Sequence, residues 1–135
     1  MTDIRQALTE KYGERTVTSL DDFLEHTGMA ARLVAVGRDR FFADEFVMLA
    51  AEAVAIRLGE SINRMDKNFL GDHGHLGLRP ILSARHVIAH GYDIIDHEVL
   101  WDAYTNDLPP IASAVRRLLD VPEPESATAA TLPTS

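Results

Sequence analysis

Apolar residues recur along this chain every three to four positions, the spacing that places side chains on one side of an α-helix. A short first helix is predicted from an N-cap at Thr2 to about Lys11. The first core helix is predicted to start at Ser19, which resembles a capping box with Asp22, and to end near Gly37. Its expected buried residues are Leu20, Phe23, Leu24, Ala31 and Val34.

The segment from about Phe41 to Met65 is the longest predicted helix, and it carries two adjacent apolar stripes. A wide apolar arc of this kind indicates that the helix contacts several others. The first stripe contains Phe42, Phe46, Leu49, Ala53 and Ile56. The second contains Val47, Ala51, Val54, Leu58, Ile62 and Met65.

The second half of the chain is divided by glycine, proline and aspartate. The stretch 71–77 contains three glycines and is predicted to be a loop, and Pro80 suits the first turn of a third helix ending at Gly91. Asp96 is expected to cap a fourth helix and Asp107 to start a last one. These segments, joined by short connections, predict an all-α fold, a helical bundle.

Length and composition fit one such domain. The 135 residues are 46% apolar, which is enough to bury a single core. We expect the helical domain to span residues 17–120, after an N-terminal extension with a short helix at 1–16. Residues 121–135 are rich in Pro, Glu, Ser, Ala and Thr and are predicted to form a disordered tail.

The charge and the absence of cysteine restrict the classes of site. No cysteine is present, so disulfides and thiolate metal sites are excluded. The net charge of −8 opposes general attraction to nucleic acid, so an RNA site would have to be a local basic cleft. No window approaches the roughly 18 apolar residues of a membrane span, and the first residues lack a signal-peptide layout, so a cytoplasmic location is expected.

One segment concentrates chemically active side chains: Arg85, His86, His90 and Tyr92 lie within eight residues. Arginine offers a forked donor for phosphate, and histidine, with an ordinary pKa of about 6.5, exchanges a proton near neutral pH. RNA supplies its own nucleophile, the 2′-hydroxyl. A histidine base and an arginine at the phosphorus could therefore cleave it without a metal or cofactor.

The spacing of this pair favours a site shared by two chains. Residues five apart on a straight helix differ by about 140° in direction, so Arg85 and His90 do not face the same point. Either Gly91 lets the helix unwind, or two copies of the helix meet across a twofold axis. We favour the dimer.

The spacing of Arg85, His90 and Tyr92 resembles the signature of HepT-like toxins of the HEPN superfamily. In that signature four residues separate the arginine from the histidine, and one separates the histidine from the tyrosine. A single string of this kind is a weak signal, but flanking segments match as well. The resemblance covers about residues 17–120 and includes 37–44, 51–53, 58–60, 92–96, Trp101 and 107–109.

This resemblance implies a homodimeric HEPN-type four-helix bundle and a metal-independent endoribonuclease toxin with Arg85 and His90 as catalytic residues. It also implies an MntA-type minimal nucleotidyltransferase antitoxin that attaches AMP to Tyr92. His86 stands where the family often has asparagine, and we expect it to be an accessory residue.

Other interpretations of the polar residues remain open. Zinc could bind four imidazoles, those of His73, His75, His86 and His90, although a solvated loop is the commoner role of a His-Gly-His stretch. A non-catalytic HEPN module that binds nucleotide or RNA is a second alternative. His26 and His97 are interpreted as surface or capping positions. The expected RNA contacts are His73, His75 and Arg79, with Arg57, Arg64 and Lys67 sharing one side of the long helix.

Overall fold

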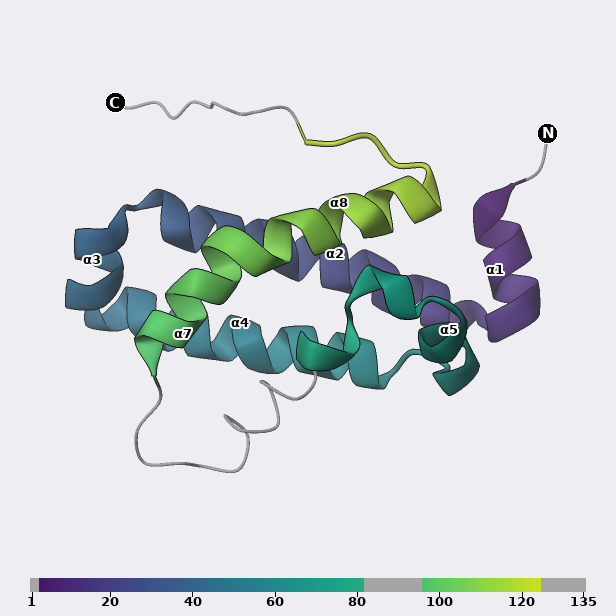
Figure 1. The fold of residues 1–135 in the computed structure, drawn as a ribbon, viewed down its shortest axis with the longest axis horizontal. Helices are drawn as coiled ribbons and strands as arrows, with labels where there is room; N and C mark the ends of the chain where they lie inside the picture. The colour runs from purple at the N-terminus through teal and green to yellow at the C-terminus, as the bar shows by residue number, and fades with distance from the viewer. Residues whose placement is uncertain (1–2, 82–95, 125–135) are drawn as a thin grey trace.

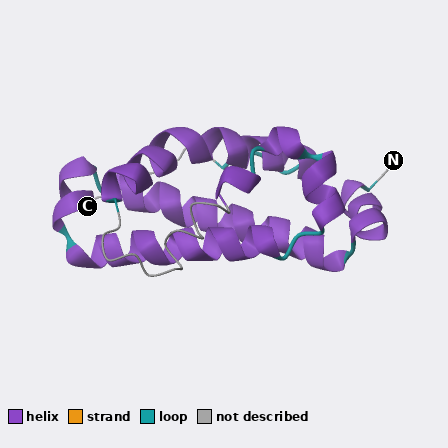
Figure 2. Ribbon diagram, turned by 60° about the horizontal axis from the view of Figure 1, so that its bottom comes forward, coloured by secondary structure: helices purple, strands orange, loops and turns teal. Residues whose placement is uncertain are grey.

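A computed structural model of the chain describes residues 3–81 and 96–124, and every regular element within these two ranges is a helix (Figure 2). The predicted all-α class is therefore confirmed. Within the same ranges no helix has both the length and the apolar character needed to cross a membrane.

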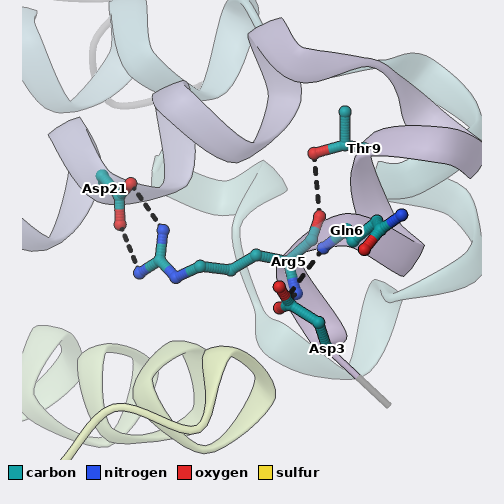
Figure 3. Close-up of polar contacts among 5 residues, drawn as sticks. All are labelled: Asp3, Arg5, Gln6, Thr9 and Asp21. Carbon is teal, nitrogen blue, oxygen red and sulfur yellow. Dashed lines mark hydrogen bonds and ion pairs between the residues drawn. The ribbon is translucent and has the colours of Figure 1, made fainter.

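Helix α1 (Ile4–Tyr12) is capped by Asp3, not by Thr2 as predicted. The Asp3 carboxylate accepts hydrogen bonds from two backbone amides of the first turn, including that of Arg5 at 3.0 Å. The Arg5 guanidinium then reaches across to Asp21 and makes two parallel hydrogen bonds of 2.9 Å (Figure 3). This bidentate pair ties α1 to the next helix.

Helix α2 (Glu14–Ala35) begins five residues before the predicted start at Ser19. The break falls at Gly13, whose φ of 100° is a conformation that glycine adopts readily, and α2 starts immediately after it. Ser19 lies inside the helix and is 1% exposed, so the capping-box pattern was misleading. Ala30, not Ala31, is the buried alanine.

The predicted helix from Phe41 to Met65 is two helices, α3 (Arg38–Ala43) and α4 (Glu45–Asn63). Asp44 separates them because its carboxylate accepts hydrogen bonds from the backbone amides of Phe46 and Val47, at 2.9 and 3.4 Å. An aspartate in this role favours an extended backbone at its own position and so interrupts the helix.

The two stripes of α4 have different surroundings. The second stripe is buried from Val47 to Ile62, with Met65 buried just beyond the helix. In the first stripe, by contrast, Phe46 is 80% exposed, Leu49 is 56% exposed and Ala53 is also exposed. Within the described part of this single chain, the second stripe is therefore covered by other helices, whereas much of the first stripe is not.

Short helices occupy most of the predicted loop. Helix α5 (Lys67–Asp72) is capped by Asp66, and a 3₁₀ turn (Gly74–Leu76) follows it. The chain is helical again from Arg79 to Ile81, where the first described range ends. Pro80 thus lies in a first helical turn as predicted. The rest of the predicted third helix, including Gly91, lies outside the described residues.

The last two predicted helices form one continuous helical run. Asp96 caps α7 (His97–Asp102) as predicted, and its carboxylate accepts hydrogen bonds from the second and third backbone amides of the helix. Asp107, however, makes no side-chain cap before α8 (Leu108–Leu119).

A π-helical turn (Ala103–Asp107) joins α7 to α8. The Leu108 amide donates to the Ala103 carbonyl, five residues back. Pro109 and Pro110 follow in the first turn of α8, where proline is tolerated because the first amides of a helix have no partner within it.

Helices α2 and α4 run side by side and form the centre of the bundle (Figure 1). The run from α7 to α8 crosses them, with α7 packing on α4 and α8 on α2. The Tyr104 hydroxyl, in the π turn, donates a 2.6 Å hydrogen bond to the Ala51 carbonyl of α4. Phe23, Phe41 and Phe69 are completely buried in this core.

Candidate functional site

The proposed catalytic residues Arg85 and His90, with His86 and Tyr92, lie outside the described residues. Their roles therefore stay predictions. The structure describes the surroundings of Ile81 and Asp96, the residues on either side of this segment. It also shows where the predicted RNA contacts lie.

A largely apolar groove of about 620 Å³ is lined by residues from both sides of the segment 82–95. Ile81, the last residue before the segment, and Val99, in the first turn after it, both line this groove. The π turn forms another wall and adds two polar residues, Asn106 and Asp107. The described chain thus meets one groove directly before the segment that carries the motif and again three residues after Asp96, where the described chain resumes.

His97 anchors the chain where this segment ends. Its Nε2 lies 2.7 Å from Glu52 Oε2, and each side chain is 24% exposed. The pair joins the first turn of α7 to the middle of α4. His97 was expected to be a surface or capping residue, and its contact with Glu52 was not foreseen, because the two residues are 45 positions apart.

Two of the three basic residues predicted to share one side of the long helix do share a pocket. Arg57 of α4 and Arg64, the residue after its end, both line an open pocket of about 330 Å³. Lys67 is not on this helix, because α4 ends at Asn63 and Asp66 caps a separate helix, α5. That part of the prediction is wrong.

The other side of this pocket comes from α2, through Asp22 and His26. His26 Nδ1 lies 2.8 Å from the Asp22 carbonyl oxygen. Since a carbonyl can only accept, Nδ1 carries the hydrogen, and the neutral ring then has its lone pair on Nε2. Glu60 and Ser61 of α4 complete the lining.

The local electrostatics keep His26 uncharged near neutral pH. Partial burial lowers the pKa of His26, and the nearby Arg57 and Arg64 cations lower it further, while Glu25 and Asp22 oppose the shift. The pocket therefore contains two cations, two carboxylates and a neutral imidazole. Sequence reasoning missed the contribution of α2, although the spacing of Asp22 and His26, four apart, was a signal that they share a helix face.

His73 and Arg79 line a separate small pocket of about 100 Å³. The His73 ring stacks on Phe69 with a centroid distance of 4.5 Å, and its Nδ1 lies 3.2 Å from the Phe69 carbonyl oxygen. The ring of His75 is tilted, with its centroid 5.8 Å from that of His73, and this residue is exposed.

The four-histidine zinc site remains untested as a whole because His86 and His90 lie outside the described residues. Among the residues that are described, no group of three histidines, aspartates or glutamates is arranged to hold a metal ion.

Comparison with known protein families gives a match to the family model described as HepT-like, Ribonuclease HepT-like, over residues 20–118. This range contains Arg85, His90 and Tyr92 together with all of α3, α4, α5 and α7. No curated protein and no solved structure shows significant similarity to the chain.

Proposed function

Because the chain belongs to the HepT-like ribonuclease family, with an all-α fold of HEPN type, we propose that it is the toxin of a type VII-like toxin–antitoxin pair. In this proposal it is a metal-independent endoribonuclease with an Arg85-x4-His90-x-Tyr92 active site. The single observation that carries it is the family match, which spans that motif within residues 20–118.

The proposed reaction is an internal transesterification of RNA. His90 removes the proton of a 2′-hydroxyl, and the 2′-oxygen attacks the adjacent phosphorus. The bond to the 5′-oxygen of the next nucleotide breaks, and that oxygen takes a proton from solvent or from His86, the accessory residue. Arg85 stabilises the charge that builds on the phosphorus oxygens. The products are a 2′,3′-cyclic phosphate and a 5′-hydroxyl.

We further propose that the active form is a homodimer. The exposed stripe of Phe46, Leu49 and Ala53 on α4 supports this, because large apolar side chains gathered on one helix face mark contact surfaces. On a straight helix, Arg85 and His90 of one chain point in different directions. In a dimer, each cleft would combine residues of two chains, so an arginine and a histidine could still meet there.

Control by a minimal nucleotidyltransferase antitoxin of MntA type is the last part of the proposal. The phenolic oxygen of Tyr92 attacks the α-phosphate of ATP, pyrophosphate leaves, and the phenol loses its proton. The attached AMP would place an anion two residues from His90, where it would compete with RNA for Arg85.

The test is cleavage of single-stranded RNA by purified protein in the presence of EDTA. We expect cleavage to continue. His90→Ala should lower its rate by about 10²- to 10⁴-fold, the usual cost of removing a general base. Arg85→Ala should lower it by about 10²- to 10³-fold, the usual cost of removing one donor to the charge of the transition state. Arg15→Ala is the matched control, because Arg15 is an exposed arginine on α2.

Three results would contradict the proposal. A wild-type rate for His90→Ala would remove the proposed base. Activity that EDTA abolishes and zinc restores would favour the four-histidine site. RNA binding without any cleavage would favour the non-catalytic HEPN module.

A further inference from the structure

The pocket between α2 and α4 offers two strong hydrogen-bond donors that the described structure leaves available. Arg57 and Arg64 are seven residues apart, two turns of helix, and so point to the same side of α4. Within residues 3–81 and 96–124 neither forms a salt bridge, although Arg5, Arg38, Arg40 and Arg116 do. Two guanidinium groups on one wall suit a phosphate.

The same pocket also offers acceptors, which the phosphodiester of a nucleic-acid strand cannot use because it carries no hydroxyl. Asp22 and Glu60 present carboxylates, and neither is among the residues that form salt bridges in the described ranges. His26 adds the lone pair of Nε2, because its Nδ1–H is held by the Asp22 carbonyl oxygen. A ligand that matches this lining must therefore carry an anion and at least one hydroxyl donor.

A ribonucleotide has both features. Within a strand its phosphodiester is an anion that offers only acceptors, and its ribose carries the 2′-hydroxyl that distinguishes RNA from DNA. The volume of about 330 Å³ lies at the lower end of the range for small-ligand pockets, which fits one nucleotide unit and not a longer stretch. A phosphodiester without its ribose would leave the carboxylates without a role.

We propose that this pocket holds one ribonucleotide of the RNA strand, with the phosphate on Arg57 and Arg64 and the ribose 2′-hydroxyl donating to Asp22, Glu60 or His26. The site would select RNA over DNA and help to hold the strand while another part of it is cleaved. This inference rests on the proposed ribonuclease function for the identity of the strand. The contacts themselves come from α2 and α4.

Binding measurements test it without depending on cleavage. The full chain carrying His90→Ala is titrated with a short single-stranded RNA of uridines and with the matching deoxyuridine strand, at several salt concentrations. Arg57→Gln and Arg64→Gln should each weaken binding of both strands about two- to tenfold. Each should also reduce the slope of the logarithm of the binding constant against the logarithm of the salt concentration. The reduction is about 0.7 for every phosphate that the variant no longer neutralises.

The carboxylate variants should behave differently. Asp22→Ala and Glu60→Ala should leave DNA binding unchanged or tighter, because a repelling charge is removed, while the preference for RNA falls about two- to tenfold. Arg15→Gln is the control, since it removes an exposed arginine of α2 that does not line the pocket. Circular dichroism checks that every variant keeps its helices.

The outcomes separate this inference from the ribonuclease proposal. If Arg57→Gln and Arg64→Gln weaken binding no more than Arg15→Gln, the arginines are only a solvated face and the pocket assignment is wrong. If the arginine variants weaken binding but the carboxylate variants keep the full RNA preference, the ribose part of the assignment is overturned. Neither result affects cleavage that depends on His90.

Discussion

Among single residues, aspartate has a repeated role at the helix starts of this protein. Asp3, Asp44, Asp66 and Asp96 each stand just before a helix and accept hydrogen bonds from its first backbone amides. Of these, only Asp96 was predicted as a cap from the sequence. Around the other three, the neighbouring residues are also compatible with a helix that starts at another position. The local sequence pattern therefore did not identify these aspartates as caps.

Tyr92 is the residue on which the proposed regulation depends. Co-expression with a cognate nucleotidyltransferase should add AMP to the peptide that contains Tyr92 and stop RNA cleavage. Tyr92→Phe should escape this modification and keep most of its activity, because the acid–base scheme of Arg85 and His90 needs no phenol. Mass spectrometry of the co-expressed protein reads the site directly, with Tyr104→Phe as a control because Tyr104 is 4% exposed.

AMP on a residue other than Tyr92, or a Tyr92→Phe variant that is still modified and silenced, would show that control works in another way. The ribonuclease proposal would stand in either case.

Among the elements, the break between α3 and α4 gives a prediction with a defined pH dependence. Hydrogen bonding to the Phe46 amide, and to Arg40 and the Val47 amide, holds the pKa of Asp44 below its ordinary value, although partial burial opposes this. A carboxyl group whose pKa is lower in the folded than in the unfolded chain stabilises the folded state at pH values above the pKa that the group has in the unfolded chain. That contribution is lost as the pH falls through the folded value.

Asp44→Ala should therefore lower the Tm near neutral pH by about 2–6 °C, because the first amides of α4 lose their acceptor. The difference from wild type should shrink as the pH falls below the ordinary range of aspartate, since protonation then removes the same interaction. Thermal unfolding followed by circular dichroism across this pH range measures both effects.

Glu45→Ala is the matched control for the cap. Glu45 is the next residue, is exposed and also lies in the first turn of α4, but it makes no side-chain hydrogen bond to those amides. Its removal should have a smaller effect on the Tm. An equal loss in both variants would mean that charge near the helix start, not capping by Asp44, stabilises the break.

For the whole molecule, the exposed stripe on α4 predicts the oligomeric state. We expect light scattering at micromolar concentration to give twice the 14.9 kDa of one chain. Phe46→Glu combined with Leu49→Glu should reduce the mass to that of a monomer, because charges would be buried in the contact. If the site is shared between chains, RNA cleavage should fall at the same time.

Val36→Glu is the control, because Val36 is an exposed apolar residue beyond the end of α2 and outside the stripe. A monomeric wild-type protein with full activity would contradict both the dimer and the shared site. A dimer that survives the double substitution would move the contact to another face.

The sequence by itself determined the helical class, the family and the segments that become α2, α4, α7 and α8. Helical periodicity and family signatures are local patterns, and the chain carries them whatever its final packing. Sequence reasoning also placed Arg57 and Arg64 on one side of a helix, since residues seven apart share a helix face, and both residues line one pocket.

Tertiary structure alone decided which of the two stripes on α4 is covered and which residues meet across the bundle. Both stripes have the same helical spacing, but Val47 lies in the core while Phe46 does not, so burial depends on what packs there. Likewise, His26 lies beside Arg57 only because α2 and α4 pack together. Lys67 is not among the residues that line this pocket, because α4 ends at Asn63 and Asp66 caps a separate helix.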